Sequence, residues 1–333
     1  MALGKAGRAS TAGEIVALIG DELARVEECL GAESEAPVEA ITAIGRHLRA
    51  GGGKRLRPVL LLLSSRLFGE AGASAIRLAA VVELIHTATL VHDDVIDGAD
   101  TRRGRPSPNV KWGNHTSVLA GDWLYMKAFQ IALREANFHI LDLLIAVTQL
   151  MVEGELIQLE RLGSIRVSES DYLDLVSRKT AALFATCARL GAVCAGATER
   201  DEQRLGEYAW NLGMAFQLVD DVLDFTAAED VLGKPVGSDL REGKLTLPLI
   251  YALERASPAD RMMVETVLAD RSYERVPFRA VLELAESLGG IRRARLRAEE
   301  FAGTARRMIE QFPPSPYQRA LSALTELVIE RES

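Results

Sequence analysis

Cysteine is scarce in this sequence, and acidic residues outnumber basic ones. The 333 residues include three cysteines, Cys29, Cys187 and Cys194, which cannot all pair with one another. No histidine lies near Cys187 and Cys194 to complete a zinc-binding spacing, so we expect free thiols in a reducing compartment, the cytoplasm. Asp and Glu number 47 against 39 Lys and Arg, a net charge of −8. This sign opposes attraction to nucleic acid or to an anionic membrane, so no nucleic-acid partner is expected and a polyanionic ligand would need a local basic patch or a bound metal.

Long apolar runs are also missing. The most apolar stretch, 140–152, is interrupted by Asp142 and is shorter than the roughly 20 residues that span a bilayer. Residues 1–12 lack the continuous apolar segment of a signal peptide. We therefore expect no transmembrane segment, and residues 1–10 to be a disordered tail.

Proline is absent from two long stretches, 59–105 and 109–234, which are rich in Ala, Leu and Glu. Because proline interrupts helices and these residues favour them, the stretches predict helix after helix. Thr11 followed by Glu14 predicts a capping box. The helices are expected at 11–30, 37–50, 55–68, 72–98, 116–134, 138–162, 169–195, 201–228, 245–255, 259–268, 278–287, 290–311 and 317–331. No alternating strand pattern competes with them, and no flexible linker divides them, so the sequence predicts one all-α domain over 1–333, a single large helical bundle around a central cavity.

The pattern D-D-x-x-D occurs twice in apolar surroundings, as Asp93, Asp94 and Asp97 and then as Asp220, Asp221 and Asp224. On a helix turning about 100° per residue, the three carboxylates of each motif share one arc. Three like charges on an apolar helix are costly unless a cation compensates them, and hard oxygen donors suit Mg²⁺. Each motif therefore predicts a carboxylate cluster that binds Mg²⁺.

Basic residues recur near glycines and after the first aspartate cluster. They form G-G-K-R-L-R-P at 52–58, then Arg102-Arg103-Gly104, Lys179-Thr180, Gly233-Lys234 and Gly243-Lys244. Lys54 and Arg57 lie three residues apart at the start of a predicted helix, where the helix dipole and free N–H groups also favour an anion. Together with two metal-type clusters, these residues predict phosphate binding.

These motifs, with E-L-I-H-T-A-T-L-V-H-D-D-V-I-D, G-D-W-L-Y, R-K-T-A, G-M-A-F-Q-L-V-D-D-V-L-D-F and G-K-P-x-G-S-D-L-R-E-G-K, occur in one order between about residues 52 and 252. In that order they resemble the trans-prenyltransferases, or all-trans polyprenyl diphosphate synthases. The resemblance implies the isoprenoid synthase fold, a homodimer, and three Mg²⁺ per active site. It also implies that isopentenyl diphosphate is condensed with an allylic diphosphate, whose pyrophosphate departs under the influence of the metals held by both clusters.

The resemblance also implies roles for individual residues. Isopentenyl diphosphate would be bound by Lys54, Arg57, His86 and Arg103. The allylic diphosphate would be bound by Arg102, Lys179, Thr180, Gln217, Lys234 and Lys244, with Lys179 also counted among the catalytic residues beside the six aspartates. The glycine-rich stretch 233–243 has the composition of a lid that would exclude water from the carbocation. His92 matches no ligand position and is expected to be structural.

Product length is expected to depend on the residues upstream of Asp93. Ala88 and Thr89, five and four positions before it, are small, whereas family members that stop at C15 or C20 carry a bulky side chain at this level. The resemblance therefore implies an open shaft and a medium or long product, C30 or above, closest to octaprenyl-type synthases. Tyr125, Met126 and Phe129 are the candidates for a deeper floor.

Three alternatives remain open from the sequence. A short-chain synthase making C15 or C20 products would share all of the motifs. A terpene cyclase would bring a different second metal motif and a pocket richer in aromatics, whereas this chain has 18 aromatic residues. A non-catalytic partner subunit would generally carry eroded motifs, whereas both clusters are intact here.

Overall fold

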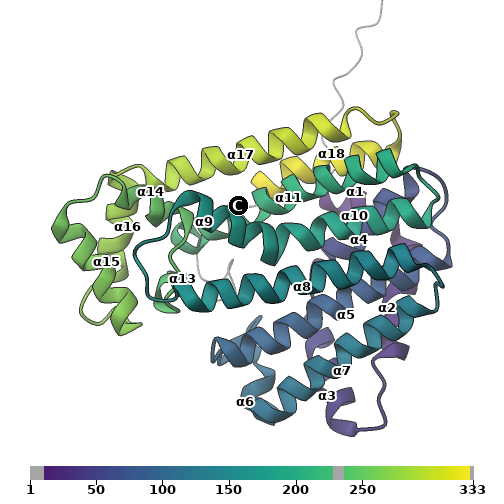
Figure 1. Cartoon of the computed structure of the whole chain (residues 1–333), viewed down its shortest axis with the longest axis horizontal. Coiled ribbons are helices and arrows are strands. Elements are labelled where there is room, and N and C mark those ends of the chain that lie inside the picture. Colours follow the sequence, from purple (N-terminus) through teal and green to yellow (C-terminus); the bar gives the residue numbers. More distant parts are fainter. Residues whose placement is uncertain (1–10, 228–235, 331–333) are drawn as a thin grey trace, which may run out of the picture.

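The computed structural model describes residues 11–227 and 236–330, and most of that part of the chain is helical (Figure 1). The elements are α1 Ala12–Ala17, α2 Gly20–Glu33, α3 Glu39–Ala50, α4 Leu56–Arg66, α5 Ala73–Ile96, β1 Thr101–Arg102, β2 Arg105–Pro106, α6 Pro108–Trp112, α7 Asn114–Leu133, α8 Phe138–Arg161, α9 Glu169–Val176, the π-helix η1 Ser177–Ala181, α10 Ala182–Cys194, α11 Glu199–Thr226, α13 Ser238–Arg241, α14 Leu247–Leu253, α15 Pro258–Asp270, α16 Phe278–Ser287, α17 Gly290–Ile309 and α18 Pro316–Ile329. The all-α prediction is confirmed. The tail 1–10 lies outside the described residues, and the single domain over 1–333 stays a prediction.

The core is built around two long helices. α5 is buried along most of its length and packs against α7, α4 and α2, while α11 packs against α10 and α17. In Figure 1 α8 crosses in front of α5, and α17 and α18 cover α11 at the top. Among the described residues, α5 is also the one helix that is long and apolar enough to cross a membrane, but 67% of its most apolar window is buried inside the protein. That burial is typical of the central helix of a bundle.

The N-terminal helix differs from the prediction. The capping box of Thr11 and Glu14 is confirmed, but the predicted helix 11–30 is broken between α1 and α2. Ile19, at the break, has non-helical backbone angles and is fully buried, as is Ile15. The bend allows both isoleucines to reach the core, so tertiary burial overrides local helix propensity.

A short hairpin, β1–β2, was also absent from the prediction. It pairs Thr101 with Pro106 and Arg102 with Arg105, and its two turn residues, Arg103 and Gly104, both have positive φ angles, 53° and 72°. A two-residue turn of this kind usually contains Asn-Gly or Asp-Gly, because both residues must adopt positive φ angles. Arg-Gly is not a typical sequence for it. Strands of two residues cannot display an alternating pattern, which explains why the sequence did not reveal them.

Candidate active site

The first aspartate cluster lies in the last turn of α5, and each of its carboxylates interacts with a basic residue. Burial raises the pKa of Asp93 to about 6, with Lys179 acting in the opposite direction. Asp94 is fully buried and ion-paired with Arg102 at 2.5 Å, while Lys244 Nζ donates to Asp97 Oδ2 at 3.0 Å. The second oxygen of Asp94 has no hydrogen-bond donor among the described residues. The cluster therefore interacts with cations from three other segments.

The second cluster lies in the last turns of α11 and is more deeply enclosed. Asp220 is partly exposed, whereas Asp221 is 3% exposed and Asp224 is fully buried. Both oxygens of Asp221 accept hydrogen bonds, Oδ2 from the Tyr172 hydroxyl and Oδ1 from Gln217 Nε2 at 2.9 Å. Burial, and then Asp239, raises the pKa of Asp221 well above its ordinary value.

Asp224 accepts hydrogen bonds from the segment that begins at residue 236. Its backbone carbonyl accepts the N–H of Gly237 at 2.8 Å, and its Oδ2 accepts the N–H of Asp239 at 3.2 Å. Lys244 N then donates to Asp239 O at 2.8 Å, while the Lys244 side chain reaches Asp97. The described part of the predicted lid, 236–243, thus connects the two clusters. Lys234 lies outside the described residues.

Lys179 and Thr180 lie on the π-helix η1, whose wider turn is frequent at functional sites. Lys179 Nζ is ion-paired with Glu155 and donates to Gln158 Oε1 at 3.1 Å. Thr180 Oγ1 donates to Gln217 Oε1 at 3.0 Å. A Cβ on Gly213 would lie 2.7 Å from the Cα of Ala181, so only glycine allows α11 to approach this turn so closely.

The residues predicted to bind isopentenyl diphosphate are distributed over the start of α4, α5 and the hairpin turn. The Arg57 guanidinium stands 5.4 Å from the Phe184 ring centroid, and its buried Nε has no hydrogen-bond acceptor among the described residues. Burial, with Arg57 and Arg103 nearby, lowers the pKa of His86 well below its ordinary value. Lys54 is exposed beside them. The group is a cationic site with a neutral histidine.

Buried Glu83 balances part of this positive charge. Glu83 Oε1 accepts a hydrogen bond from Arg55 Nη1 at 2.9 Å. Burial lowers the pKa values of Arg57 and Arg103, and the negative charge of Glu83 acts in the opposite direction. Neither Glu83 nor Tyr172 was predicted as a site residue from the sequence. Glu83 precedes His86 by three residues, so helical spacing from a motif residue was the available signal for Glu83. Tyr172 has no such signal, because a π-helix separates it from Lys179.

The predicted chain-length residues have different surroundings. Ala88 is fully buried, and Thr89 is partly exposed with its hydroxyl donating to His86 O at 2.7 Å. Tyr125 stacks near His92, with ring centroids 5.9 Å apart, and Phe129 packs partly buried against the core. Met126 is 64% exposed and does not face the interior of the chain. A floor within a single chain would therefore involve Tyr125 and Phe129, and Met126 could contribute only across an interface.

The two clusters suit a divalent cation in their donor chemistry. Their carboxylates lie at the C-terminal ends of helices, where the helix dipole also disfavours negative charge. Asp94 has a buried oxygen to which no described residue donates, and crowding with Glu155 and Asp97 adds to the burial that raises the pKa of Asp93. As the side chains stand, no three metal-type groups in 11–227 and 236–330 converge on one point. Binding a metal would therefore require the pairs of Asp94 with Arg102 and of Asp97 with Lys244 to separate.

Comparison with known proteins agrees with the motifs and the fold. A family model described as polyprenyl synthetase matches residues 38–284. The octaprenyl diphosphate synthase of Escherichia coli (strain K12) is 36% identical over 95% of this chain and 97% of its own length. A geranylgeranyl diphosphate synthase of Sulfolobus acidocaldarius is 43% identical over 68% of this chain and 71% of its own.

The crystal structure of a polyprenyl synthase from Caulobacter crescentus, complexed with calcium and isoprenyl diphosphate, superposes with a TM-score of 0.93. It is 36% identical in sequence, and the match covers 98% of this chain and 100% of that one. The chain belongs to the polyprenyl synthetase family and is a prenyl diphosphate synthase with the isoprenoid synthase fold.

Proposed function

We propose that this enzyme adds isopentenyl diphosphate units to an allylic diphosphate and releases an all-trans polyprenyl diphosphate of medium or long chain, C30 or above. The observation that carries the proposal is the joint presence of two aspartate clusters at the ends of α5 and α11 and a basic site beside them. No side chain in this arrangement has to act as a nucleophile, because the double bond of isopentenyl diphosphate attacks the allylic carbon. The C–O bond to pyrophosphate breaks, and the resulting carbocation then loses a proton to the departing pyrophosphate, which restores a double bond.

Mg²⁺ fits the carboxylate donors, and we propose three ions per active site, held by Asp93, Asp94, Asp97, Asp220, Asp221 and Asp224. Bound there, Mg²⁺ would neutralise the charge that develops on the departing pyrophosphate. Arg102, Lys179 and Lys244 now pair with Asp94, Glu155 and Asp97. These three cations are proposed to turn to the allylic diphosphate once the carboxylates are engaged, and Thr180, Gln217 and Lys234 are proposed to bind it as well.

The cationic site at the start of α4 is proposed to bind isopentenyl diphosphate. Lys54, Arg57 and Arg103 supply positive charge, and His86, whose pKa is lowered by burial and by the neighbouring arginines, is proposed to contribute a hydrogen bond. The buried Arg57 Nε, without an acceptor among the described residues, is suited to an incoming phosphate oxygen.

The proposed product length is supported by two observations. Ala88 and Thr89 leave no bulky side chain on α5 just below Asp93. The octaprenyl diphosphate synthase of Escherichia coli is also 36% identical over 95% of this chain. A C15 or C20 product is the alternative that an experiment must exclude.

The decisive experiment incubates the purified chain alone with Mg²⁺, an allylic diphosphate and radiolabelled isopentenyl diphosphate, and separates the products by length. Products of C30 or longer are expected. Products that stop at C15 or C20 would contradict the chain length. Complete inactivity of the folded protein would contradict the enzyme assignment and favour a non-catalytic partner subunit.

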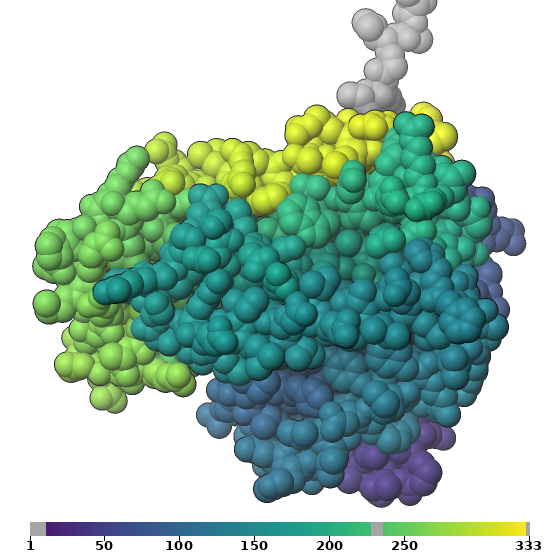
Figure 2. All heavy atoms as spheres, viewed as in Figure 1, coloured from purple at the N-terminus to yellow at the C-terminus, as the bar shows by residue number. Residues whose placement is uncertain are grey.

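We also propose a homodimer formed through the outer faces of α7 and α8, which contact each other and both reach the face of the molecule drawn in Figure 2. These faces expose Val118, Leu119, Met126, Leu133, Phe138, Ile145, Val152, Leu156 and Leu159, with Phe138 87% exposed. An apolar surface of this extent is typical of a protein interface. A monomer mass by light scattering, in an active preparation at micromolar concentration, would contradict the dimer.

A further inference from the structure

Both oxygens of Asp221 are already satisfied by neutral donors. The Tyr172 hydroxyl donates to Oδ2, and Gln217 Nε2 donates to Oδ1 at 2.9 Å. Tyr172 is 4% exposed and Asp221 3% exposed, so solvent contributes little to this pair. A buried carboxylate needs such donors, because an unsatisfied buried oxygen costs free energy.

The hydrogen bond between Tyr172 and Asp221 is one of several contacts that join α9 and η1 to α11. Thr180 Oγ1 donates to Gln217 Oε1 at 3.0 Å, Gln217 donates to Asp221, and Tyr172 donates to Asp221 from the same segment as Thr180. Trp210 Nε1 also donates to Ser177 Oγ at 2.9 Å, so α9 and η1 are joined to α11 by hydrogen bonds from Tyr172, Ser177 and Thr180. Rotation of Asp221 would change the orientation of the Gln217 amide as well.

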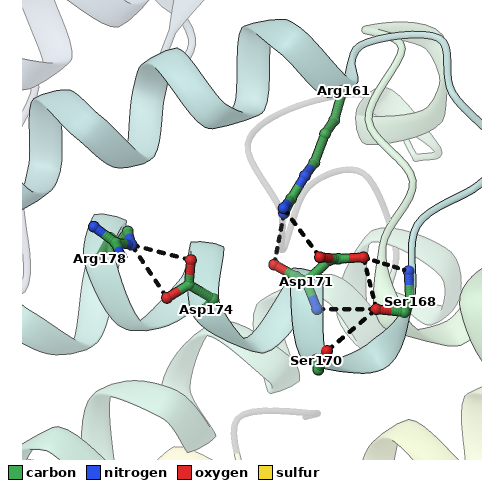
Figure 3. A network of polar contacts seen from close by, with 6 residues as sticks. All are labelled: Arg161, Ser168, Ser170, Asp171, Asp174 and Arg178. Atoms are coloured by element: carbon green, nitrogen blue, oxygen red, sulfur yellow. Dashed lines mark hydrogen bonds and ion pairs between the residues drawn. The ribbon is translucent and has the colours of Figure 1, made fainter.

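The backbone that carries Tyr172 is itself firmly held (Figure 3). Asp171, the preceding residue, forms a capping box with Ser168, and Arg161 from the end of α8 donates to Asp171 O at 2.8 Å and to its Oδ1 at 3.1 Å. Figure 3 shows Arg161 reaching down from α8 to the first turn of α9. The start of α9 is thus fixed to α8 next to the tyrosine, which leaves the ring little freedom to follow a moving Asp221.

We propose that Tyr172 is a positioning residue of the active site, whose hydroxyl holds Asp221, and through it Gln217, in the orientation required by the metal and the allylic diphosphate. The inference rests on the proposed function. It deepens that proposal by separating Asp221, anchored inside the protein, from Asp220, which is partly exposed. Partners of this kind, one step removed from a metal, typically change metal affinity or activity about 10–100-fold when they are lost.

The test compares Tyr172→Phe with Tyr208→Phe. Tyr208 is a matched control because it is fully buried on α11, about 18 Å along the helix before Asp220, and its hydroxyl donates to Leu321 O at 2.7 Å rather than to a cluster residue. Each substitution removes one buried hydroxyl and keeps the ring, so both should lower the unfolding temperature. Only Tyr172→Phe should weaken Mn²⁺ binding, measured on the enzyme without substrate by the paramagnetic resonance of free Mn²⁺, by about tenfold or more. It should also raise the Mg²⁺ concentration needed for half-maximal turnover, whereas Tyr208→Phe should leave both quantities unchanged.

Equal Mn²⁺ affinity in Tyr172→Phe, Tyr208→Phe and wild type would overturn the positioning role. If Tyr172→Phe does not fold, Tyr172→His and Tyr172→Leu replace it in the same titration, since the histidine keeps a ring with a hydrogen-bond donor and the leucine keeps no donor. Equal Mn²⁺ affinity in these two folded variants would overturn the proposal, and an affinity about tenfold lower in Tyr172→Leu than in Tyr172→His would support it. Turnover by the wild-type enzyme tests the proposed function separately, so an active wild type with an unaffected Tyr172→Phe variant would refute only the role of Tyr172.

Discussion

Replacing Ala88 by Phe should shorten the product, because it places a ring beside the path proposed for the growing tail. With a rise of about 1.5 Å per residue, Ala88 lies about 7.5 Å below Asp93 along α5, and Thr89 about 6 Å below it. At about 100° per residue, Thr89 lies about 40° around the helix from Asp93 and Ala88 about 140°. Thr89→Phe therefore provides a second obstruction at nearly the same depth but on the face of Asp93.

The cost of the new ring depends on the space beside Ala88. That residue is fully buried, so a ring that finds no cavity would overpack the core at a cost of about 1–3 kcal/mol. A ring that enters the shaft would instead occupy space otherwise taken by the tail and leave the unfolding temperature nearly unchanged. The aspartates and basic residues are untouched, so the first condensation should proceed at close to the wild-type rate.

The assay extends a short allylic primer with radiolabelled isopentenyl diphosphate and resolves the products by reversed-phase chromatography, beside thermal unfolding of each variant. The product of Ala88→Phe should move from C30 or above towards C15 or C20, and Thr89→Phe should act in the same direction. A destabilised Ala88→Phe variant with unchanged product length would show that Ala88 only packs one helix against another. Unchanged length in both variants would refute the shaft at this level.

Three further results are expected. Asp93→Ala or Asp220→Ala should each raise the barrier by about 3–5 kcal/mol, or roughly 10²–10⁴ in rate; turnover near the wild-type level in either variant would remove the metal assignment. Gly121→Ala should destabilise the fold, because its Cβ would lie 2.2 Å from His92 Nε2, and an unchanged unfolding temperature would contradict this packing. Burial raises the pKa of Glu135, but hydrogen bonding by the Arg77 guanidinium outweighs burial and lowers that pKa below 4.5. The ion pair therefore stabilises the fold above pH 4.5, and this stabilisation is lost as the pH falls through the lowered pKa. Urea unfolding of Glu135→Gln should therefore show a deficit relative to wild type at pH 7 that shrinks below pH 4.5, and a deficit independent of pH would contradict this account.

The sequence by itself determined the fold class and the chemistry. Proline-free stretches rich in Ala, Leu and Glu predict helices whatever the packing, because helix propensity and the missing proline act locally. Most of the predicted helices are present, with boundaries shifted by a few residues. The D-D-x-x-D spacing likewise places Asp93 and Asp97 on one arc from the helical repeat alone.

Only the tertiary structure decided how the candidate site residues are partnered. The pairs of Arg102 with Asp94 and of Lys244 with Asp97 join segments whose meeting depends on how the helices pack. The break at Ile19 also arises from burial in the assembled core, which local propensity cannot express. Tyr172 was missed because its hydroxyl meets Asp221 49 residues along the chain. A hydrogen bond between distant residues leaves no periodic signal in a single sequence, whereas an amphipathic helix or a repeated motif does.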